Sequence, residues 1–246
     1  MLERLKEEVY EANLDLPKYG LVKFTWGNVS ACDRDSGLFV IKPSGIAYDQ
    51  LSAKDMVVVD FDGEVVEGEY SPSSDTATHA VLYKHFEEIG GISHSHSMWA
   101  TVWAQAGLDL QAMGTTHADT FYGAVPCARF LTEEEVNRGY EVETGRLIIE
   151  TFEKRNLDVM AVPGVLLQGH GPFTWGKDAK SAVTNSVILD EVAKMNLFAK
   201  QLNEYAEPLP QRILDKHYLR KHGEHAYYGQ KLQDKEKRDI YVNKST

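Results

Sequence analysis

The segment Gly91-Ile-Ser-His-Ser-His96 alternates serine with histidine and is followed directly by a helical pattern. Successive side chains of a β-strand point to opposite faces, so His94 and His96 share one face with Ile92, and the serines share the other. The backbones of the two histidines then lie about 7 Å apart, and their imidazoles can converge on one metal ion. We therefore expect a strand over 91–96 that presents a histidine pair near its end.

A third histidine follows the apolar segment 162–167, within Gly169-His-Gly-Pro172. Its small neighbours leave room for the His170 ring, and the proline is expected to end the strand. Three histidines with an open coordination position are typical of catalytic zinc, and imidazole also suits manganese, cobalt, nickel and iron. Asp75 offers a carboxylate at a turn. The alternative that the histidine pair is structural and hydrogen-bonded stays open at this point.

Hydrophobic periodicity predicts a mixed α/β fold. Helical spacing occurs at 2–16, 76–88, 97–106, 144–156 and 178–200. Short β-branched or aromatic segments predict strands at 22–26, 38–41, 57–61, 91–96 and 162–167. Asp62-Gly63 is typical of a type I′ hairpin between 57–61 and 64–67, so the sheet should be at least partly antiparallel. A mixed sheet covered by helices implies three layers.

Two further segments are predicted to lie outside these elements. Residues 171–177 match the first positions of a phosphate-binding P-loop, but Asp178 replaces the metal-binding Ser or Thr, so we expect a connection between strand and helix. Residues 231–246 are rich in Lys, Asp and Glu and predict a polar C-terminal tail. The remaining residues, 1–230, fit a single domain.

Composition restricts the function classes. A formal net charge of -11 at pH 7 argues against a nucleic-acid partner, which would need a basic face. No apolar stretch has membrane-spanning length, and the first ten residues lack the pattern of a signal peptide. Cys32 and Cys127 lie too far apart for a redox motif or a disulfide framework, which indicates the cytoplasm. No GxGxxG follows a strand, so no nicotinamide cofactor is expected.

Three short loops carry groups that suit an anion: Thr25-Trp-Gly-Asn28, Lys42-Pro-Ser-Gly45 and Ser73-Ser-Asp75. Backbone N–H groups and hydroxyls bind phosphate by hydrogen bonding with little dependence on net charge, which reconciles an anionic substrate with an acidic chain. Each loop alone is typical of an ordinary turn. Their combination favours a phosphate site.

Six motifs occur together in order: Thr25-Trp-Gly-Asn-Val-Ser30, Ile41-Lys-Pro-Ser-Gly45, Ser73-Ser-Asp75, His94-Ser-His96, Gly114-Thr-Thr-His-Ala-Asp119 and Gly169-His-Gly-Pro-Phe173. In this combination the sequence resembles the class II aldolase family, and most closely its branch of L-ribulose-5-phosphate 4-epimerases. The resemblance runs from the N-terminus to about residue 230 and includes 214–223 and 227–229.

The resemblance implies a three-layer αβα sandwich with a mixed, largely antiparallel central sheet. It also implies a homotetramer with four-fold symmetry and active sites between adjacent subunits. One divalent metal ion per subunit, zinc first and manganese or cobalt as alternatives, would be bound by His94, His96 and His170. Asp75 would lie beside the ion or act as a fourth ligand.

The same resemblance assigns the remaining site residues. The phosphate end of a small sugar phosphate would be held by Gly27, Asn28, Lys42, Ser44, Gly45, Ser73 and Ser74. Asp119 and Tyr228, supplied by the neighbouring subunit, would move protons on opposite faces of the substrate. Supporting groups would be Thr115, Glu141 and His217.

The residue at position 75 separates two activities within the resemblance. The fuculose-phosphate aldolase branch has Glu there, whereas the epimerase branch has Asp, as this chain does. The sequence therefore favours metal-dependent epimerisation of L-ribulose 5-phosphate to D-xylulose 5-phosphate at C4, by retro-aldol cleavage and re-addition. The alternatives are a fuculose-phosphate type aldolase or related sugar-phosphate lyase, and a non-catalytic scaffold, which would not need the intact histidine set.

Overall fold

A computed structural model describes residues 2–223 and residue 226. One eight-stranded sheet runs through this part of the chain in the order β4-β3-β2-β1-β5-β8-β7-β6. The strands are β1 (Asn28–Asp33), β2 (Leu38–Ile41), β3 (Val57–Asp60), β4 (Val65–Glu67), β5 (Gly91–His94), β6 (Cys127–Ala128), β7 (Gly164–Leu167) and β8 (Pro172–Gly176). Neighbouring strands are antiparallel except β6 and β7, so the sheet is mixed and largely antiparallel, as expected.

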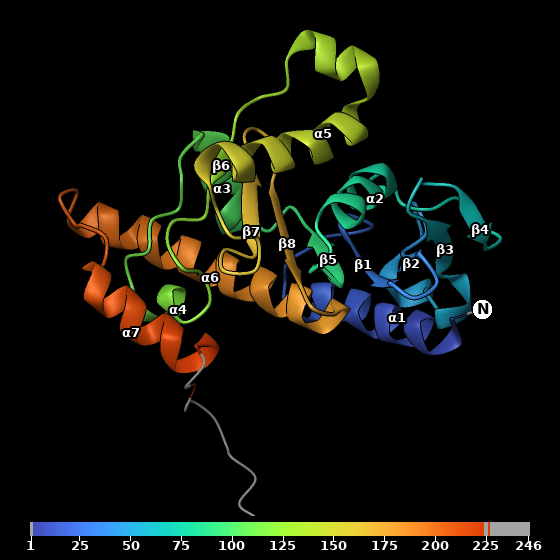
Figure 1. The fold of residues 1–246 in the computed structure, drawn as a ribbon, viewed down its shortest axis with the longest axis horizontal. Coiled ribbons are helices and arrows are strands. Elements are labelled where there is room, and N and C mark those ends of the chain that lie inside the picture. Colours follow the sequence, from blue (N-terminus) through green and yellow to red (C-terminus); the bar gives the residue numbers. More distant parts are fainter. Residues whose placement is uncertain (1, 224–225, 227–246) are drawn as a thin grey trace, which may run out of the picture.

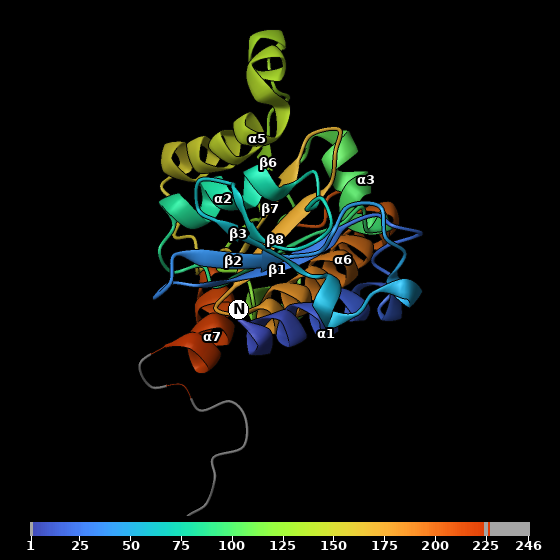
Figure 2. The same ribbon diagram turned by 90° about the vertical axis from the view of Figure 1, so that its right-hand side faces the viewer.

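Helices cover both faces of the sheet. They are α1 (Glu3–Lys18), α2 (Thr76–His85), α3 (Met98–Ala106), α4 (Thr115–Ala118), α5 (Glu133–Arg155), α6 (Ala179–Leu202) and α7 (Gln211–His222). The helices α1 and α6 pack side by side on one face, and α2 and α5 lie over the other (Figure 2). The short α4 packs against α7 beside the C-terminal half of α6 (Figure 1). These three layers confirm the predicted αβα sandwich.

The alternation of side chains along the strands builds a separate apolar core on each face. In β3, Val57 and Val59 belong to the core under α2 and α5. Val58 belongs to the core under α1 and α6, together with Val9 and Leu16 of α1. All of these side chains are fully buried. A strand with both faces covered must be apolar throughout, which explains the continuous run in β3.

The predicted strand at 22–26 is wrong. The chain turns there, with the Trp26 N–H donating to the Lys23 carbonyl and Phe24 in the left-handed region at φ 53. Phe24 is 80% exposed, so its aromatic side chain is not half-buried on a sheet as strand propensity assumes. The strand begins instead at Asn28, directly after Gly27.

The predicted connection at 171–177 is also wrong, because it contains β8. This strand is buried along its whole length and pairs with β5 on one side and β7 on the other. Pro172 is its first residue, a position that tolerates the missing N–H. Consequently His170 lies in the tight turn between β7 and β8, where its N–H donates to the Leu167 carbonyl.

The hairpin between β3 and β4 exists, but it is not of type I′. Gly63 has φ 93 and its N–H donates to the Asp60 carbonyl, whereas Asp62 does not adopt a positive φ. This is a turn over 60–63 with glycine at its last position, and the ladder contains a register shift beside it. Type I′ geometry needs positive φ at both central residues, which Asp62 avoids.

Helix and strand ends differ from the predictions at several points. Helix α2 ends at His85, three residues early, because Phe86 is extended and Arg34 donates to the Tyr83, Phe86 and Ile89 carbonyls. Strand β5 ends at His94 rather than His96. Helix α5 begins at 133, not 144, and is interrupted at Gly139 (φ 145), so 133–138 projects from the body (Figures 1 and 2).

Other predicted elements match closely, namely α1, α3, α6, β2 and β7. The proposed polar tail, 231–246, lies outside the described residues. Among the residues that the structure describes, no helix combines the length and the apolar composition needed to span a bilayer.

The crossing of α5 over α2 depends on a glycine. A Cβ added to Gly145 would lie 2.8 Å from the Val81 Cβ and 3.2 Å from the Thr78 carbonyl oxygen. Helix α2 begins directly after Asp75, so this close approach also fixes the element that carries one wall of the site.

We expect Gly145→Ala to destabilise the protein. Overpacking of this kind costs about 1–3 kcal/mol, against a gain of about 1 kcal/mol in helix propensity. Urea unfolding monitored by tryptophan fluorescence measures the net loss. Gly114→Ala is the control, since an added Cβ there meets nothing within 4 Å and its φ is -135. A more stable Gly145→Ala protein would contradict the proposed packing constraint.

Candidate metal centre and active site

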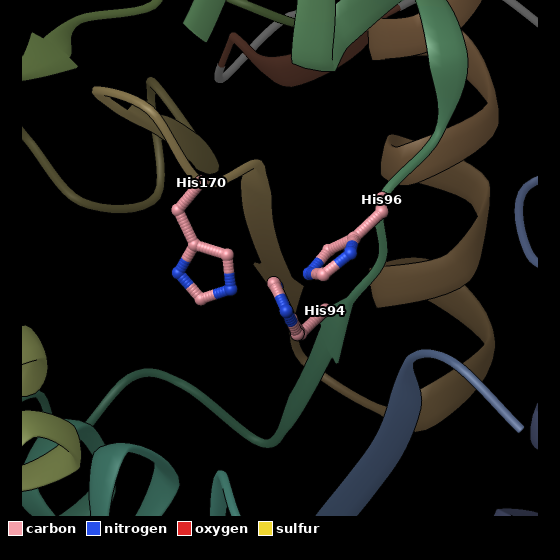
Figure 3. Close-up of side chains that lie close together, drawn as sticks. All are labelled: His94, His96 and His170. Atoms are coloured by element: carbon pink, nitrogen blue, oxygen red, sulfur yellow. The ribbon is translucent and has the colours of Figure 1, made fainter. Parts of the chain in front are cut away.

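Three imidazoles face a common centre at one end of the central strands (Figure 3). His94 is the last residue of β5, His96 follows it by two residues, and His170 comes from the turn between β7 and β8. Their ring centroids are 4.8–5.1 Å apart. The nitrogen atoms available as ligands all lie within 4.8 Å of one another. The structure therefore brings together the histidines predicted from two distant segments.

Contacts with β8, on the side away from the other two histidines, fix the orientation of the His94 ring. Its Nδ1–H donates to the Pro172 carbonyl at 2.9 Å, and its ring stacks on Phe173 with centroids 4.1 Å apart. This hydrogen bond selects the tautomer whose Nε2 lone pair is free, the usual arrangement behind a metal-binding histidine. The side chain is almost fully buried.

Desolvation inside the cavity favours the neutral form of the other two rings, although His96 stays exposed and His170 is half-buried. This desolvation lowers the pKa of His96 and, reinforced by His94 and His96, lowers the pKa of His170 to about 4. Neutral imidazole is the form that binds zinc and related ions. The donor set and its protonation thus fit one divalent ion.

Asp75 forms the wall beside this cluster. Its Oδ2 lies 4.0 Å from His94 Nε2 and accepts a 2.6 Å hydrogen bond from Asn28 Nδ2. Asn28 Nδ2 also lies 3.0 Å from Ser73 Oγ. Burial acts to raise the pKa of Asp75, but His94, His79 and the Asn28 hydrogen bond outweigh it and lower the pKa. The carboxylate is ionised and available to a cation.

The metal cluster and the three predicted anion loops share one cavity of about 320 Å³. It is lined by Thr25, Trp26, Gly27, Asn28, Lys42, Pro43, Ser44, Gly45, Ser73, Ser74, Asp75, His94, His96 and His170. Every residue predicted to bind the phosphate end is therefore in contact with the same space as the histidines. A small molecule could reach both ends at once.

Backbone contacts hold the anion loops in place. The Ser73 N–H donates to the Lys42 carbonyl and the Ser44 N–H to the Ser71 carbonyl, which ties the second loop to the third. Gly27 packs against β5, where a Cβ would lie 2.8 Å from the His94 carbonyl oxygen. Gly27 also has a φ of 75, which side chains rarely allow, so both the close contact and the backbone conformation require glycine.

Lys42 supplies a buried cation at the anion end. Its side chain is 2% exposed, its Nζ donates to the Pro43 carbonyl at 3.2 Å, and it lies 5.0 Å from the centre of the Tyr48 ring. Burial lowers the pKa of Lys42 to about 8. Among the described residues no carboxylate forms an ion pair with it. Such a cation favours an incoming anion.

Of the two predicted proton-transfer residues, Asp119 lies in the described part of the chain, away from the histidines. Asp119 follows α4 and accepts hydrogen bonds from His217 at 3.0 Å and from Arg220 at 2.8 Å. It does not line the cavity. Exposed Thr115 begins α4. Tyr228 lies outside the described residues.

Glu141 lies in α5, with its backbone carbonyl accepting from the Thr78 hydroxyl. Its neighbour Tyr140 was missed by sequence analysis, although its hydroxyl is 3.4 Å from His170 Nδ1. No local motif signals Tyr140, because the interruption at Gly139 and the packing of α5 bring it there. Trp26, whose ring is 6.1 Å from that of His96, belongs to the first anion loop but was not assigned a role.

The sequence and the fold were compared with known protein families and solved structures. The family model described as Class II Aldolase and Adducin N-terminal domain matches residues 7–197. A solved L-fuculose 1-phosphate aldolase is 28% identical, with a TM-score of 0.73 over 87% of this chain and 94% of that chain. The L-fuculose 1-phosphate aldolase from Glaciozyma antarctica PI12 has a TM-score of 0.71 at 21% identity, over 88% of this chain and 80% of that chain. YgbL from Escherichia coli has a TM-score of 0.69 at 22% identity, over 87% of this chain and 97% of that chain.

The sheet topology and the histidine cluster define an α/β protein equipped to bind a divalent metal. The family match spans most of the sequence, and the chain belongs to the class II aldolase and adducin family. The two structural matches below 25% identity support the fold alone.

The buried Lys42 makes stability depend on pH. Its pKa is about 8 in the fold against an ordinary 10.5, so between these values the unfolded chain binds more protons and stability rises with pH. Relative to Lys42→Met, the metal-free wild type should gain up to about 3 kcal/mol from pH 8 to 10.5. Urea unfolding of both proteins at several pH values measures this difference. If the difference in unfolding free energy between the two proteins did not change with pH, Lys42 would not be a buried, unpaired cation.

Proposed function

We propose that this protein is a metal-dependent sugar-phosphate 4-epimerase that converts L-ribulose 5-phosphate to D-xylulose 5-phosphate. The observation that carries the proposal is the single cavity in which three histidines and Asp75 face three anion-binding loops. A phosphorylated sugar needs both ends of this cavity, one for its phosphate and one for its oxygen-bearing carbons. Asp75, rather than Glu, favours epimerisation over net cleavage within the resemblance described above.

The reaction requires carbon-carbon bond cleavage. The C4 hydrogen of a 2-ketopentose is not adjacent to the carbonyl, so simple enolisation cannot remove it. Loss of the C4 hydroxyl proton and cleavage of C3–C4 give a three-carbon enediolate and glycolaldehyde phosphate. Rotation of the aldehyde and re-formation of the bond then invert C4.

In this proposal His94, His96 and His170 hold one divalent ion, zinc first and manganese or cobalt as alternatives, with Asp75 beside it or as a fourth ligand. The ion would supply Lewis-acid stabilisation of the negative charge that develops on the substrate oxygens, an effect of several kcal/mol. The Asn28 amide holds the Asp75 carboxylate on the cavity side. The Pro172 carbonyl keeps His94 in its ligand tautomer.

The anion loops would hold the phosphate throughout. Lys42 provides charge, and Ser44, Ser73 and Ser74 provide hydroxyl and backbone donors beside Gly27 and Gly45. Anchoring the phosphate keeps glycolaldehyde phosphate in place after cleavage, so the aldehyde can rotate without being released. Retention of this fragment distinguishes an epimerase from an aldolase with the same bond-breaking step.

Inversion at C4 needs proton transfer on two faces in turn. We assign these steps to Asp119 and Tyr228 of a neighbouring subunit in a four-fold homotetramer, with Thr115, Glu141 and His217 as supporting groups. Burial acts to raise the pKa of Asp119, but hydrogen bonds from Arg220 and His217 outweigh it and lower the pKa. The carboxylate is thus ionised and able to accept a proton. Its absence from the cavity of its own chain is consistent with action across an interface.

A second candidate is an aldolase of the fuculose-phosphate type. It is favoured by the L-fuculose 1-phosphate aldolase that is 28% identical with a TM-score of 0.73. The two activities share the metal centre and the cleavage step, and they differ in whether the aldehyde leaves.

Product analysis decides between the two. We expect chelator-treated protein to be inactive, and zinc or manganese to restore conversion of L-ribulose 5-phosphate to D-xylulose 5-phosphate, measured by chromatography. His170→Ala serves as the control that metal cannot rescue. Release of glycolaldehyde phosphate, or cleavage of L-fuculose 1-phosphate, would assign the protein to the aldolases. Metal binding without turnover of either sugar phosphate would reject both.

Mixing of variants tests the shared active site. Asp119→Asn and His170→Ala should each lower turnover, the former by about 10²–10⁴. Because the two residues would come from different subunits, co-expressed and differently tagged variants should regain activity at about one quarter of their sites. Turnover of the purified mixed oligomer measures this recovery. An inactive mixed oligomer would place Asp119 outside the neighbouring site.

A further inference from the structure

Tyr48 contacts two of the three anion loops but does not line the cavity. It begins the short 3₁₀ helix Tyr48–Gln50, which follows the second loop, Lys42–Gly45, closely in the sequence. The side chain is 7% exposed and belongs to the apolar core under α1 and α6. Neither the family resemblance nor the proposed mechanism gives it a role.

The Tyr48 hydroxyl holds the backbone of the first loop. Its oxygen is 2.7 Å from the Trp26 carbonyl oxygen and 2.9 Å from the Gly27 carbonyl oxygen. A carbonyl can only accept, so the phenol is the donor in both contacts. Burial raises the pKa of Tyr48, so the proton stays on the phenol at neutral pH. Two consecutive peptide groups therefore share one buried donor.

The peptide group between Trp26 and Gly27 has its N–H on the edge opposite to this contact. The peptide is trans and planar, so the Gly27 N–H points away from the carbonyl that Tyr48 binds. Gly27 lines the cavity, and its N–H has no acceptor among the described residues. A backbone N–H of this kind is available to an anion. The hydrogen bond to the carbonyl thus also sets the direction of a donor in the anion site.

The ring of Tyr48 contacts the cation of the second loop. Lys42 Nζ lies 5.0 Å from the ring centroid, within the range of a cation–π contact. The same ammonium group donates to the Pro43 carbonyl at 3.2 Å. Because the face of an aromatic ring carries partial negative charge, the Tyr48 ring offsets part of the cost of burying Lys42.

We propose that Tyr48 is a positioning residue for a phosphate monoester: its hydroxyl orients the Gly27 N–H toward the phosphate, and its ring holds Lys42 beside it. The inference rests on the proposed function only in taking the three loops as the phosphate site. One side chain behind the cavity wall then aligns a backbone donor and a positive charge from two separate loops.

Two substitutions separate the hydroxyl from the ring. Tyr48→Phe keeps the ring beside Lys42 and removes the donor to the two carbonyls, whereas Tyr48→Leu removes both. Tyr83→Phe is the matched control. Tyr83 is also buried, its hydroxyl oxygen is 2.7 Å from Ser30 Oγ, and the Arg34 guanidinium lies 5.6 Å from its ring. It belongs to the core under α2 and α5, on the other face of the sheet.

Two probes separate the phosphate end of the cavity from the metal end in the zinc-loaded protein. Glycerol 3-phosphate carries a phosphate monoester, whereas acetohydroxamate chelates zinc and has no phosphate. Isothermal titration calorimetry measures the affinity of each probe. Thermal unfolding measures the stability of each variant, so a loss of affinity can be compared with a loss of stability.

We expect glycerol 3-phosphate to bind about 10-fold more weakly to Tyr48→Phe, as when one hydrogen bond to a charged group is lost. Tyr48→Leu should lose about 5-fold more, and this second loss should vanish in a Lys42→Met background. Acetohydroxamate should bind every variant with wild-type affinity. Tyr83→Phe should lower the unfolding temperature but keep wild-type affinity for both probes.

Wild-type affinity of Tyr48→Phe for glycerol 3-phosphate would overturn the proposal, and so would equal losses for the two probes or an equal loss in Tyr83→Phe. If Tyr48→Leu does not fold, Tyr48→Phe and its control decide. Wild-type protein that binds acetohydroxamate but not glycerol 3-phosphate would also overturn it, since the loops would then not form an anion site. Neither measurement depends on turnover, so a failure of the epimerase assay remains a separate result.

Discussion

The pairing of β5 with β1 and β8 is the constraint on which the metal centre depends. It sets Asn28 and Phe173 beside His94 on the two neighbouring strands. From β8 the His94 ring receives a stacking partner and an acceptor for its Nδ1 proton, and from β1 the Asp75 carboxylate receives its amide donor. A slip of one residue in either ladder would turn these side chains to the opposite face of the sheet. Ligand geometry is thus a property of strand register.

Sequence analysis succeeded where the signal is local. The histidines of 91–96 and the three anion loops are short motifs, and the structure brings them to one cavity. Strand β8 was missed because Pro172 suggests the end of a strand, yet as a first residue it needs no N–H. Tyr140 has no local signature, since only the packing of α5 brings its hydroxyl to His170. Tertiary contacts decide such positions.

An acidic chain can hold an anion because the relevant charges are local. The net charge of -11 is spread over the whole sequence, whereas the cavity concentrates Lys42 with hydroxyl and backbone donors. Burial strengthens each of these contacts by removing competing water. The same burial keeps His170 neutral, so one low-dielectric pocket prepares its histidines for a cation and its lysine for an anion. Both effects follow from withdrawing polar groups from solvent.

Asp75 occupies the N-cap position of α2 without capping it, because its carboxylate bonds to Asn28 instead. The amides of the first helical turn therefore lack a side-chain acceptor, and the helix macrodipole places about half a positive elementary charge at that end. Ser73 and Ser74 lie immediately before it, on the wall of the cavity. Part of the electrostatic potential that an anion meets there comes from peptide groups, and replacing side chains leaves that part in place.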